Sequence, residues 1–534
     1  MNVQSSTLTP QPQPVFNHMS RTASDDLHKL IWSLSAAEIR YFKIFSSRHY
    51  DANDTNYVKL FDAIANHKEY NEAKILEKFK KEKFIKKFSI AKARLYESIL
   101  RALDIYHAGS SIDAEMKREI HYAEILYKKS LYDQCAKVLS SAKRVAVKYE
   151  RHSALLEIYL WEKKLIEVDN YSDNTETDIN KFLGEDKLIG EKIKNFNDYW
   201  NIKSHLFMIL NKQGKARTKD ELQKFKKIID NTLLETESEA LSTETKYLFN
   251  HIYSAYYFGV GDYQKCYDYL KKNVELIENS KHIFEEEPNI YFSVLTNIIY
   301  ISSQLKKFDE AFFYLKKLRE VPHTFDIRRN EDMEIKLFSS TFSIEITLYN
   351  TLGDFEKSME LISAIEDGLD KYSGKINKLR EAYFYSSIAV AYFGSQKFSQ
   401  ALRWNNKILN DKSIEQHEDI HCFAKIFNLI IHIELKNESL IPYTYRATHR
   451  YLKQRERSYK FESVFMKFVE QLMKEKQKKV LAEQYRSLYN ELKSLEKDPL
   501  EQPVFEFFDF ASWAQGKAEN RYFRQIVEEK ANRQ

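Results

Sequence analysis

The chain has no proline between Pro14 and Pro288, and only 11 glycines in its 534 residues. A sheet protein of this size needs frequent turns, which Gly and Pro make at low cost. A chain that avoids both residues for so long is therefore expected to be nearly all helix with short polar connections. Its 30% charged and 43% hydrophobic residues suit amphipathic helices with wet outer faces. We predict an all-α fold.

Charge and cysteine content exclude several classes of protein. The 83 Lys and Arg against 78 Asp and Glu leave a net charge of +5, which argues against a histone-like or polybasic protein. Three cysteines without regular spacing predict no disulfide framework and favour a reducing compartment. No apolar run approaches the roughly 20 residues that a membrane span needs. Residues 1–23 are polar and rich in Pro and Gln, so we expect a disordered tail on a cytoplasmic protein without a membrane partner.

Residues 24–110 are predicted to form a small helical head. Ser35 and Glu38 have the spacing of a capping box, in which each side chain bonds a free N–H of the first helical turn. An apolar stripe at helical spacing follows at Tyr57, Leu60, Phe61 and Ile64. Several short helices in this length indicate a bundle, and both a helix-turn-helix-like and a winged-helix-like arrangement remain open.

Five later segments share a pattern of one aromatic residue after a turn and one small residue three positions on. The aromatic residues are Tyr132, Tyr263, Phe308, Phe355 and Phe398, and the small ones are Cys135, Cys266, Ala311, Ser358 and Ala401. This spacing places both side chains on one face at the start of a helix, where the small residue lets the preceding helix approach closely. The pattern predicts antiparallel helix pairs, with Cys135 and Cys266 as packing residues.

The pattern resembles the tetratricopeptide repeat (TPR), a helix–turn–helix with Gly-Asp-Tyr-like residues at the turn. The best matches are Gly261-Asp262-Tyr263 and Gly353-Asp354-Phe355. The last four turn aromatics are 45, 47 and 43 residues apart, whereas the family repeats every 34. The resemblance therefore implies a TPR-like α-solenoid with degenerate repeats and not a regular array.

The predicted organisation has five parts. After the tail and the head come irregular helical repeats with long helices at 111–240, TPR-like repeats at 241–498, and an aromatic segment at 499–534. In the irregular part, Trp200, Leu206 and Leu210 are expected to be internal anchors. The last part contains VFEFFDFASW, which is interpreted either as a cap over the open end of the solenoid or as a docking peptide.

The TPR resemblance implies a function as well as a fold. Proteins of this kind bind a peptide or another protein along the surface made by the first helix of each pair. Carrying the register over by the turn motif gives the expected groove residues His251, Thr296, Ser343, Asn350 and Ser386. We expect a non-enzymatic scaffold or adaptor with a protein or peptide partner.

One motif points to metal chemistry. His417-Glu418-Asp419-Ile420-His421 matches H-E-x-x-H, which on a helix can hold zinc with the glutamate polarising a bound water. The charged Asp419 and the absence of an evident third ligand favour a solvated helix start, with an adventitious metal site or a zinc hydrolase as alternatives. Phosphate-binding loops and G-x-S-x-G are absent. No cofactor is predicted.

Two basic stretches remain, at 74–94 and 443–460. The first carries a possible nucleic-acid patch, Lys80, Lys83, Lys86 and Lys87, and the second interleaves arginines with tyrosines. Each is interpreted first as a solvated face. The alternative function is a regulator whose basic head binds nucleic acid under control of the repeats, by analogy with bacterial regulators of that layout.

Overall fold

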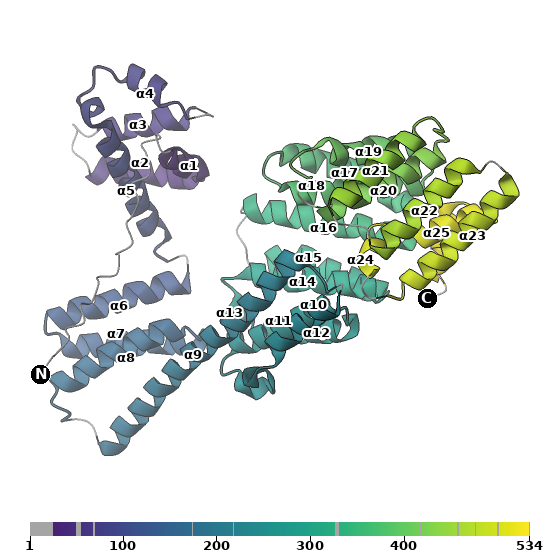
Figure 1. Ribbon diagram of the computed structural model, residues 1–534. Coiled ribbons are helices and arrows are strands. Elements are labelled where there is room, and N and C mark those ends of the chain that lie inside the picture. The colour runs from purple at the N-terminus through teal and green to yellow at the C-terminus, as the bar shows by residue number, and fades with distance from the viewer. Residues whose placement is uncertain are drawn as a thin grey trace, which may run out of the picture. The chain divides into compact units, whose positions relative to one another are not determined.

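The computed structural model describes the chain in eleven ranges and shows helices but no strand within them. The described ranges are 25–49, 55–67, 70–109, 111–172, 175–216, 218–325, 331–415, 418–455, 459–475, 477–498 and 501–532. Their helices follow one another in sequential pairs (Figure 1). The predicted all-α fold is therefore confirmed, and the pairing is that of a helical repeat.

The chain divides into two compact units. The first consists of the described residues up to Ala146 together with Glu157–Tyr171, and the second of Val147–Leu156 and those from Ser172 onward. The part predicted as 111–240 is thus shared between the units. The tail predicted for residues 1–23 lies outside the described residues.

The head is a bundle around one core, as expected. Its helices are α1 (Asp26–Ser33), α2 (Ala36–His49), α3 (Thr55–Ala65), α4 (Glu72–Lys78) and α5 (Phe88–His107), with a 3-10 helix at Lys83–Lys87. The capping box is present, since Glu38 accepts from the Ser35 N–H at 2.7 Å and Ser35 Oγ accepts from the Glu38 N–H at 3.3 Å. Leu60, Phe61 and Ile64 are buried. The described part of the head contains no strand, so it shows no wing.

Three helices complete the first unit: α6 (Ile112–Lys128), α7 (Tyr132–Lys148) and α8 (His152–Val168). The unit includes α7 up to Ala146 and α8 from Glu157 onward. The rings of Tyr127 and Trp161 lie 5.5 Å apart between α6 and α8. Cys135 is fully buried, and its Sγ donates to the Ala123 carbonyl at 3.3 Å. The small residue at this position therefore lets α6 and α7 approach closely.

The second unit begins with the long helix α9 (Glu176–Gln213), followed by α10 (Lys219–Ile229) and two short 3-10 helices, Thr232–Leu234 and Glu237–Glu239. Leu206 is fully buried and Leu210 partly buried, but Trp200 is 49% exposed. The predicted anchor at Trp200 is wrong. Tyr199, one residue and about 100° earlier on the helix, is buried in its place and donates to the Leu233 carbonyl.

Six helix pairs follow. They are α11 (Thr243–Val260) with α12 (Tyr263–Asn279), α14 (Pro288–Gln304) with α15 (Phe308–Thr324), α16 (Glu331–Leu352) with α17 (Phe355–Lys371), α18 (Lys378–Gly394) with α19 (Phe398–Asn410), α20 (Glu418–Glu434) with α21 (Ile441–Gln454), and α22 (Lys460–Lys474) with α23 (Lys478–Leu495). A single turn of helix, α13 (Lys281–Phe284), separates the first two pairs. Each of the five predicted turn aromatics is the first residue of its helix.

The five turns that precede the predicted aromatic residues share one backbone geometry. A residue with positive φ stands two positions before the aromatic residue in all five turns, at Ser130, Gly261, Lys306, Gly353 and Gln396. The next N–H bonds back five residues, as Asp262 does to the Tyr257 carbonyl at 2.9 Å and Lys397 to the Tyr392 carbonyl at 2.8 Å. This bond satisfies a free carbonyl at the helix end. The recurring turn explains why the aromatic and small residues keep their spacing while the helices vary in length.

The Gly-Asp-aromatic sequence has a physical reason at its two best matches. The glycine takes the left-handed conformation without a steric cost. The following aspartate caps the next helix, since Asp262 accepts from the Lys265 N–H at 3.1 Å and Asp354 from the Lys357 N–H at 3.2 Å. The small residues after the turn, from Cys266 to Ala401, are all buried.

The chain ends in three helices, α24 (Gln502–Phe505), α25 (Phe510–Glu519) and α26 (Phe523–Asn532). We call residues 501–532 the C-terminal segment. Phe510 and Trp513 are fully buried within the same core as α18, α20, α22 and α23. This burial agrees with the cap interpretation, because a docking peptide for another molecule needs these side chains free.

The close approach of α26 to the α16–α17 turn predicts a position-specific cost. A Cβ added at Gly353 lies 2.9 Å from the backbone N of Glu528, whereas one at Gly374, with nearly the same positive φ, meets open space. We expect Gly374→Ala to cost about 1 kcal/mol of unfolding free energy through backbone strain, and Gly353→Ala to cost about 2 kcal/mol more through overpacking. Denaturant unfolding of both variants measures the difference. Equal costs contradict the docking of α26 at this turn.

Candidate binding surface

The first helices of the six pairs, α11, α14, α16, α18, α20 and α22, carry the expected groove residues. We call the surface that they form the first-helix face. His251 lies in α11, Thr296 in α14, Ser343 and Asn350 in α16, and Ser386 in α18. All five therefore stand on first helices.

Burial separates these five residues. Thr296, Ser343 and Asn350 are partly exposed, but Ser386 is buried. His251 stacks between the rings of Phe207 and Tyr247, at 5.0 and 5.3 Å. Burial, with a smaller contribution from Lys203, lowers the pKa of His251 to about 4. The burial of Ser386 does not fit an open groove, and the role of the other four residues stays a prediction.

The partly exposed groove residues have local hydrogen bonds. The Thr296 hydroxyl donates to the Phe292 carbonyl at 2.8 Å, one turn back on its own helix. Asn350 Nδ2 donates to the Ser387 carbonyl at 2.9 Å and so joins α16 to α18. Its Oδ1 is buried and has no partner among the described residues. The Asn350 bond thus holds two first helices together, while its amide oxygen has no partner among the described residues.

The chain's own C-terminal segment packs against the first-helix face at α18, α20 and α22, and Figure 1 shows its helix α25 beside α22 and α23. Phe507 stacks on Tyr383 of α18 and Phe423 of α20, with ring centroids 6.2 and 5.0 Å apart. Phe508 lies 5.2 Å from Phe393 and 5.0 Å from Phe427, on the same two helices. Phe505 lies 5.5 Å from Phe461 of α22. The aromatic run therefore crosses three successive first helices.

A mostly buried lysine pairs with the first carboxylate of this run, Glu506. Lys215, in the α9–α10 loop, is 12% exposed and pairs with Glu506. Its Nζ also donates to the hydroxyls of Tyr263 and Tyr300, at 2.9 and 3.0 Å. Burial alone lowers a lysine pKa, but the adjacent Glu506 carboxylate outweighs it, and the pKa of Lys215 stands above its usual value. The lysine is therefore charged and paired at neutral pH.

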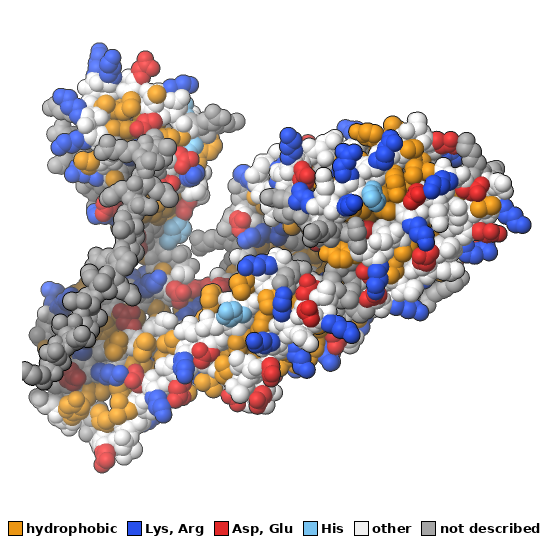
Figure 2. All heavy atoms as spheres, viewed as in Figure 1, with side chains coloured by type: hydrophobic (Ala, Val, Ile, Leu, Met, Phe, Trp, Pro, Cys, Tyr) orange, Lys and Arg blue, Asp and Glu red, His pale blue; other side chains and the backbone are white. Residues whose placement is uncertain are grey.

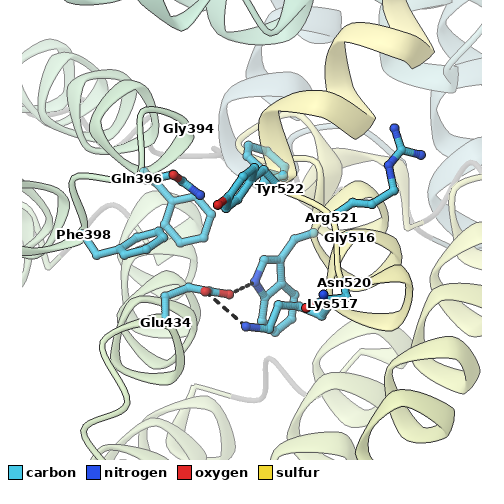
Figure 3. Close-up of a pocket in the computed structure, with 12 residues that line it drawn as sticks. Gly394, Gln396, Phe398, Glu434, Gly516, Lys517, Asn520, Arg521 and Tyr522 are labelled. Atoms are coloured by element: carbon cyan, nitrogen blue, oxygen red, sulfur yellow. Dashed lines mark hydrogen bonds and ion pairs between the residues drawn. The ribbon is translucent and has the colours of Figure 1, made fainter.

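Three further contacts anchor the rest of the C-terminal segment. The Trp513 indole donates to Glu434 at 2.7 Å, and Lys517 pairs with the same carboxylate at 3.2 Å (Figure 3). Lys530 of α26 pairs with Asp509 at 2.7 Å. Burial alone raises the pKa of Asp509, but this lysine and the Ser512 N–H hold it below its usual value. Helices α25 and α26 are thus fixed by charged hydrogen bonds as well as by packing.

A small cavity of about 280 Å³ lies where the turn between α25 and α26 meets the turn between α18 and α19. Gln396 and Tyr522 face each other across its opening, with Phe398 and Glu434 beside them (Figure 3). Because Trp513 and Lys517 already bind Glu434, the cavity presents no free carboxylate to a ligand.

The structure describes only part of the H-E-x-x-H motif. His417 and the side chain of Glu418 lie outside the described residues, while Asp419 is exposed and Ile420 is buried. His421 is buried with its ring 5.1 Å from Tyr451. Burial, and then Lys425, lower its pKa to about 4. Within the described ranges, no three His, Cys, Asp or Glu side chains are grouped to hold a metal.

The basic patch of the head lies on the turn after α4 and on the 3-10 helix before α5. Lys80, Lys86 and Lys87 are exposed, and the side chain of Lys83 lies outside the described residues. Figure 2 shows Lys and Arg side chains gathered on the head surface around α4. In the second basic stretch, Arg446 and Arg450 are exposed on α21 beside Tyr443.

Sequence reasoning missed the Lys215–Glu506 pair. The two residues are 291 positions apart, and no local pattern marks Lys215. A signal did exist in the aromatic run, where Glu506 and Asp509 interrupt a series of phenylalanines. A charge within a buried apolar run needs a partner of opposite charge. These carboxylates could therefore have indicated that specific cations contact the run.

No family model and no curated protein matches the chain. Among the described helices, none is long and apolar enough to cross a membrane.

Proposed function

We propose that the protein is a non-enzymatic scaffold or adaptor that binds a protein or peptide on the first-helix face. One observation carries the proposal: this face binds an aromatic segment of the same chain, through Phe505, Phe507 and Phe508. A surface that binds three aromatic side chains and one carboxylate has the chemistry of a peptide-binding site. The TPR-like turn motif and the cytoplasmic location expected from composition fit this role.

The experiment compares two substitutions of the same kind on opposite helices of one pair. Ser343→Arg places a bulky cation on the first-helix face of α16, and Ser363→Arg places it on the exposed side of α17. Full-length protein is used for affinity capture from source-cell extract with nuclease treatment, followed by mass spectrometry. We expect partners captured by the wild type to be lost with Ser343→Arg and kept with Ser363→Arg. Identical capture by both variants contradicts the proposal.

The exposed lysines of the head support a second candidate, a regulator that binds nucleic acid. Lys80, Lys86 and Lys87 have no ion-pair partner among the described residues. Three such charges neutralise phosphates and release counterions, which makes binding depend on salt.

The test of this candidate uses matched lysine substitutions. Changing Lys80, Lys86 and Lys87 to Ala should weaken binding of a duplex DNA or RNA probe at least tenfold at about 50 mM salt. The control changes three exposed lysines of α10 to Ala, namely Lys224, Lys226 and Lys227. Fluorescence anisotropy across a salt series measures both. Equal loss in the two triple variants, or no binding by the wild type, removes this candidate.

A further inference from the structure

We call the side chains that contact Phe505–Phe508 the seat of the aromatic run. It offers three aromatic contacts, formed by Tyr383 with Phe423, by Phe393 with Phe427, and by Phe461. The carboxylate of Glu506 meets one cation, Lys215, which is 12% exposed and has the hydroxyls of Tyr263 and Tyr300 around it. An occupant must therefore supply aromatic side chains on both sides of one carboxylate.

The cation makes the seat selective. A buried charge whose partner is removed is strongly destabilising, because it keeps its desolvation cost and loses its attraction. Lys215 is almost fully buried, and its partner in cis is Glu506. An occupant with a neutral side chain at this position leaves the lysine without a counter-charge. The seat is thus expected to discriminate strongly between Glu and Gln.

Residues 504–508 are held more loosely than the helix that follows them. Val504 to Phe507 are partly exposed and Phe508 is 3% exposed, while Phe510 and Trp513 are fully buried. Residues 506–509 lie outside helices, and α24 is only four residues long. Segments without regular backbone hydrogen bonding open at lower free energy than the helices of the core. Residues 504–508 can therefore leave their seats while α25 stays anchored.

We propose that residues 504–508 are a resident peptide on the first-helix face, and that a partner segment of the same chemistry takes their place with its carboxylate on Lys215. The partner is an acidic, phenylalanine-rich peptide. This inference rests on the proposed function and adds the partner's chemistry and the means of its control. A tethered segment has a high effective concentration, so the resident peptide keeps the face closed to weak or neutral competitors.

The test uses two synthetic peptides and the full-length chain. The first peptide has the sequence of residues 502–509, and the second has Gln in place of the glutamate that corresponds to Glu506. The chain is used as wild type, as Glu506→Ala, and as the matched control Glu519→Ala, which removes an exposed carboxylate of α25. Circular dichroism checks that each variant is folded.

We expect the Glu peptide to bind Glu506→Ala at least tenfold more tightly than the wild type or Glu519→Ala. We expect the Gln peptide to bind Glu506→Ala at least tenfold more weakly than the Glu peptide does. Equal affinity of Glu506→Ala and wild type for the Glu peptide, or equal affinity of the two peptides for Glu506→Ala, overturns the inference.

A second measurement needs no variant. Hydrogen exchange of the wild type is followed with and without saturating Glu peptide. Residues 504–508 should exchange faster when the peptide is present, while Phe510–Glu519 should be unchanged. If residues 504–508 exchange at the same rate at saturation, the peptide does not displace them and the inference is wrong.

Failure of the proposed function gives a different result. In that case the Glu peptide still binds Glu506→Ala more tightly than wild type. The wild type, however, captures from the extract no protein that is lost with Ser343→Arg. If only the inference fails, the wild type still captures partners that are lost with Ser343→Arg, but the Glu and Gln peptides bind Glu506→Ala with equal affinity.

Discussion

Replacing Trp513 by Ala is expected to cost about 4 kcal/mol of unfolding free energy, in the range of large-to-small substitutions in a core. The indole is 1% exposed and contacts Phe465, Phe468 and Tyr485. Its N–H also donates to Glu434, so the substitution leaves a cavity and removes a donor from a buried carboxylate.

The chain provides a matched control in Trp200. This residue is 49% exposed on α9, and Trp200→Ala is expected to change stability by no more than about 0.5 kcal/mol. Denaturant unfolding of the two variants, with equal slopes, measures the contrast. Similar costs for both tryptophans contradict a C-terminal segment that completes the core.

Acid is expected to destabilise the second unit through two histidines, of which His421 is buried and His251 partly buried. His251 and His421 each have a folded pKa of about 4, against about 6.5 in an unfolded chain. Below pH 6.5 the unfolded chain binds protons that the folded chain does not, so stability is complete above pH 6.5 and falls as the pH drops toward 4. At pH 5 each histidine accounts for a loss of about 2 kcal/mol.

The variants His251→Phe and His421→Phe separate the two contributions. Phe can stack in place of His251 between Phe207 and Tyr247 and does not bind protons. Each substitution should reduce the loss between pH 7 and pH 5 by about 2 kcal/mol, and the double variant by the sum. Urea unfolding at both pH values gives the numbers. If the free energy of unfolding depends on pH in both single variants as it does in the wild type, folding does not keep either imidazole neutral.

The fold could be predicted because its signals are local. The scarcity of Gly and Pro indicates helices, and the turn geometry explains why an aromatic and a small residue recur at fixed spacing, from Tyr132 with Cys135 to Phe398 with Ala401. Trp200 was placed wrongly because two adjacent apolar residues on a helix point about 100° apart, and the sequence does not say which of them faces the core.

The candidate site depends on contacts that no local pattern contains. The groove residues were taken from a register, which places residues on a helix but does not reveal what covers them. His251 is enclosed by Phe207 and Tyr247 from two helices. Glu506 meets Lys215 across 291 residues. Such pairings follow from the path of the C-terminal segment, which periodicity cannot specify.

Hydrogen exchange of the full-length protein tests most directly whether the C-terminal segment is bound to the first helices. We expect the backbone amides of α25 to exchange as slowly as those of α20, because Phe510 and Trp513 share a core with that helix. Exchange of α25 at the rate of an unstructured peptide, while α18 to α22 remain protected, contradicts the account.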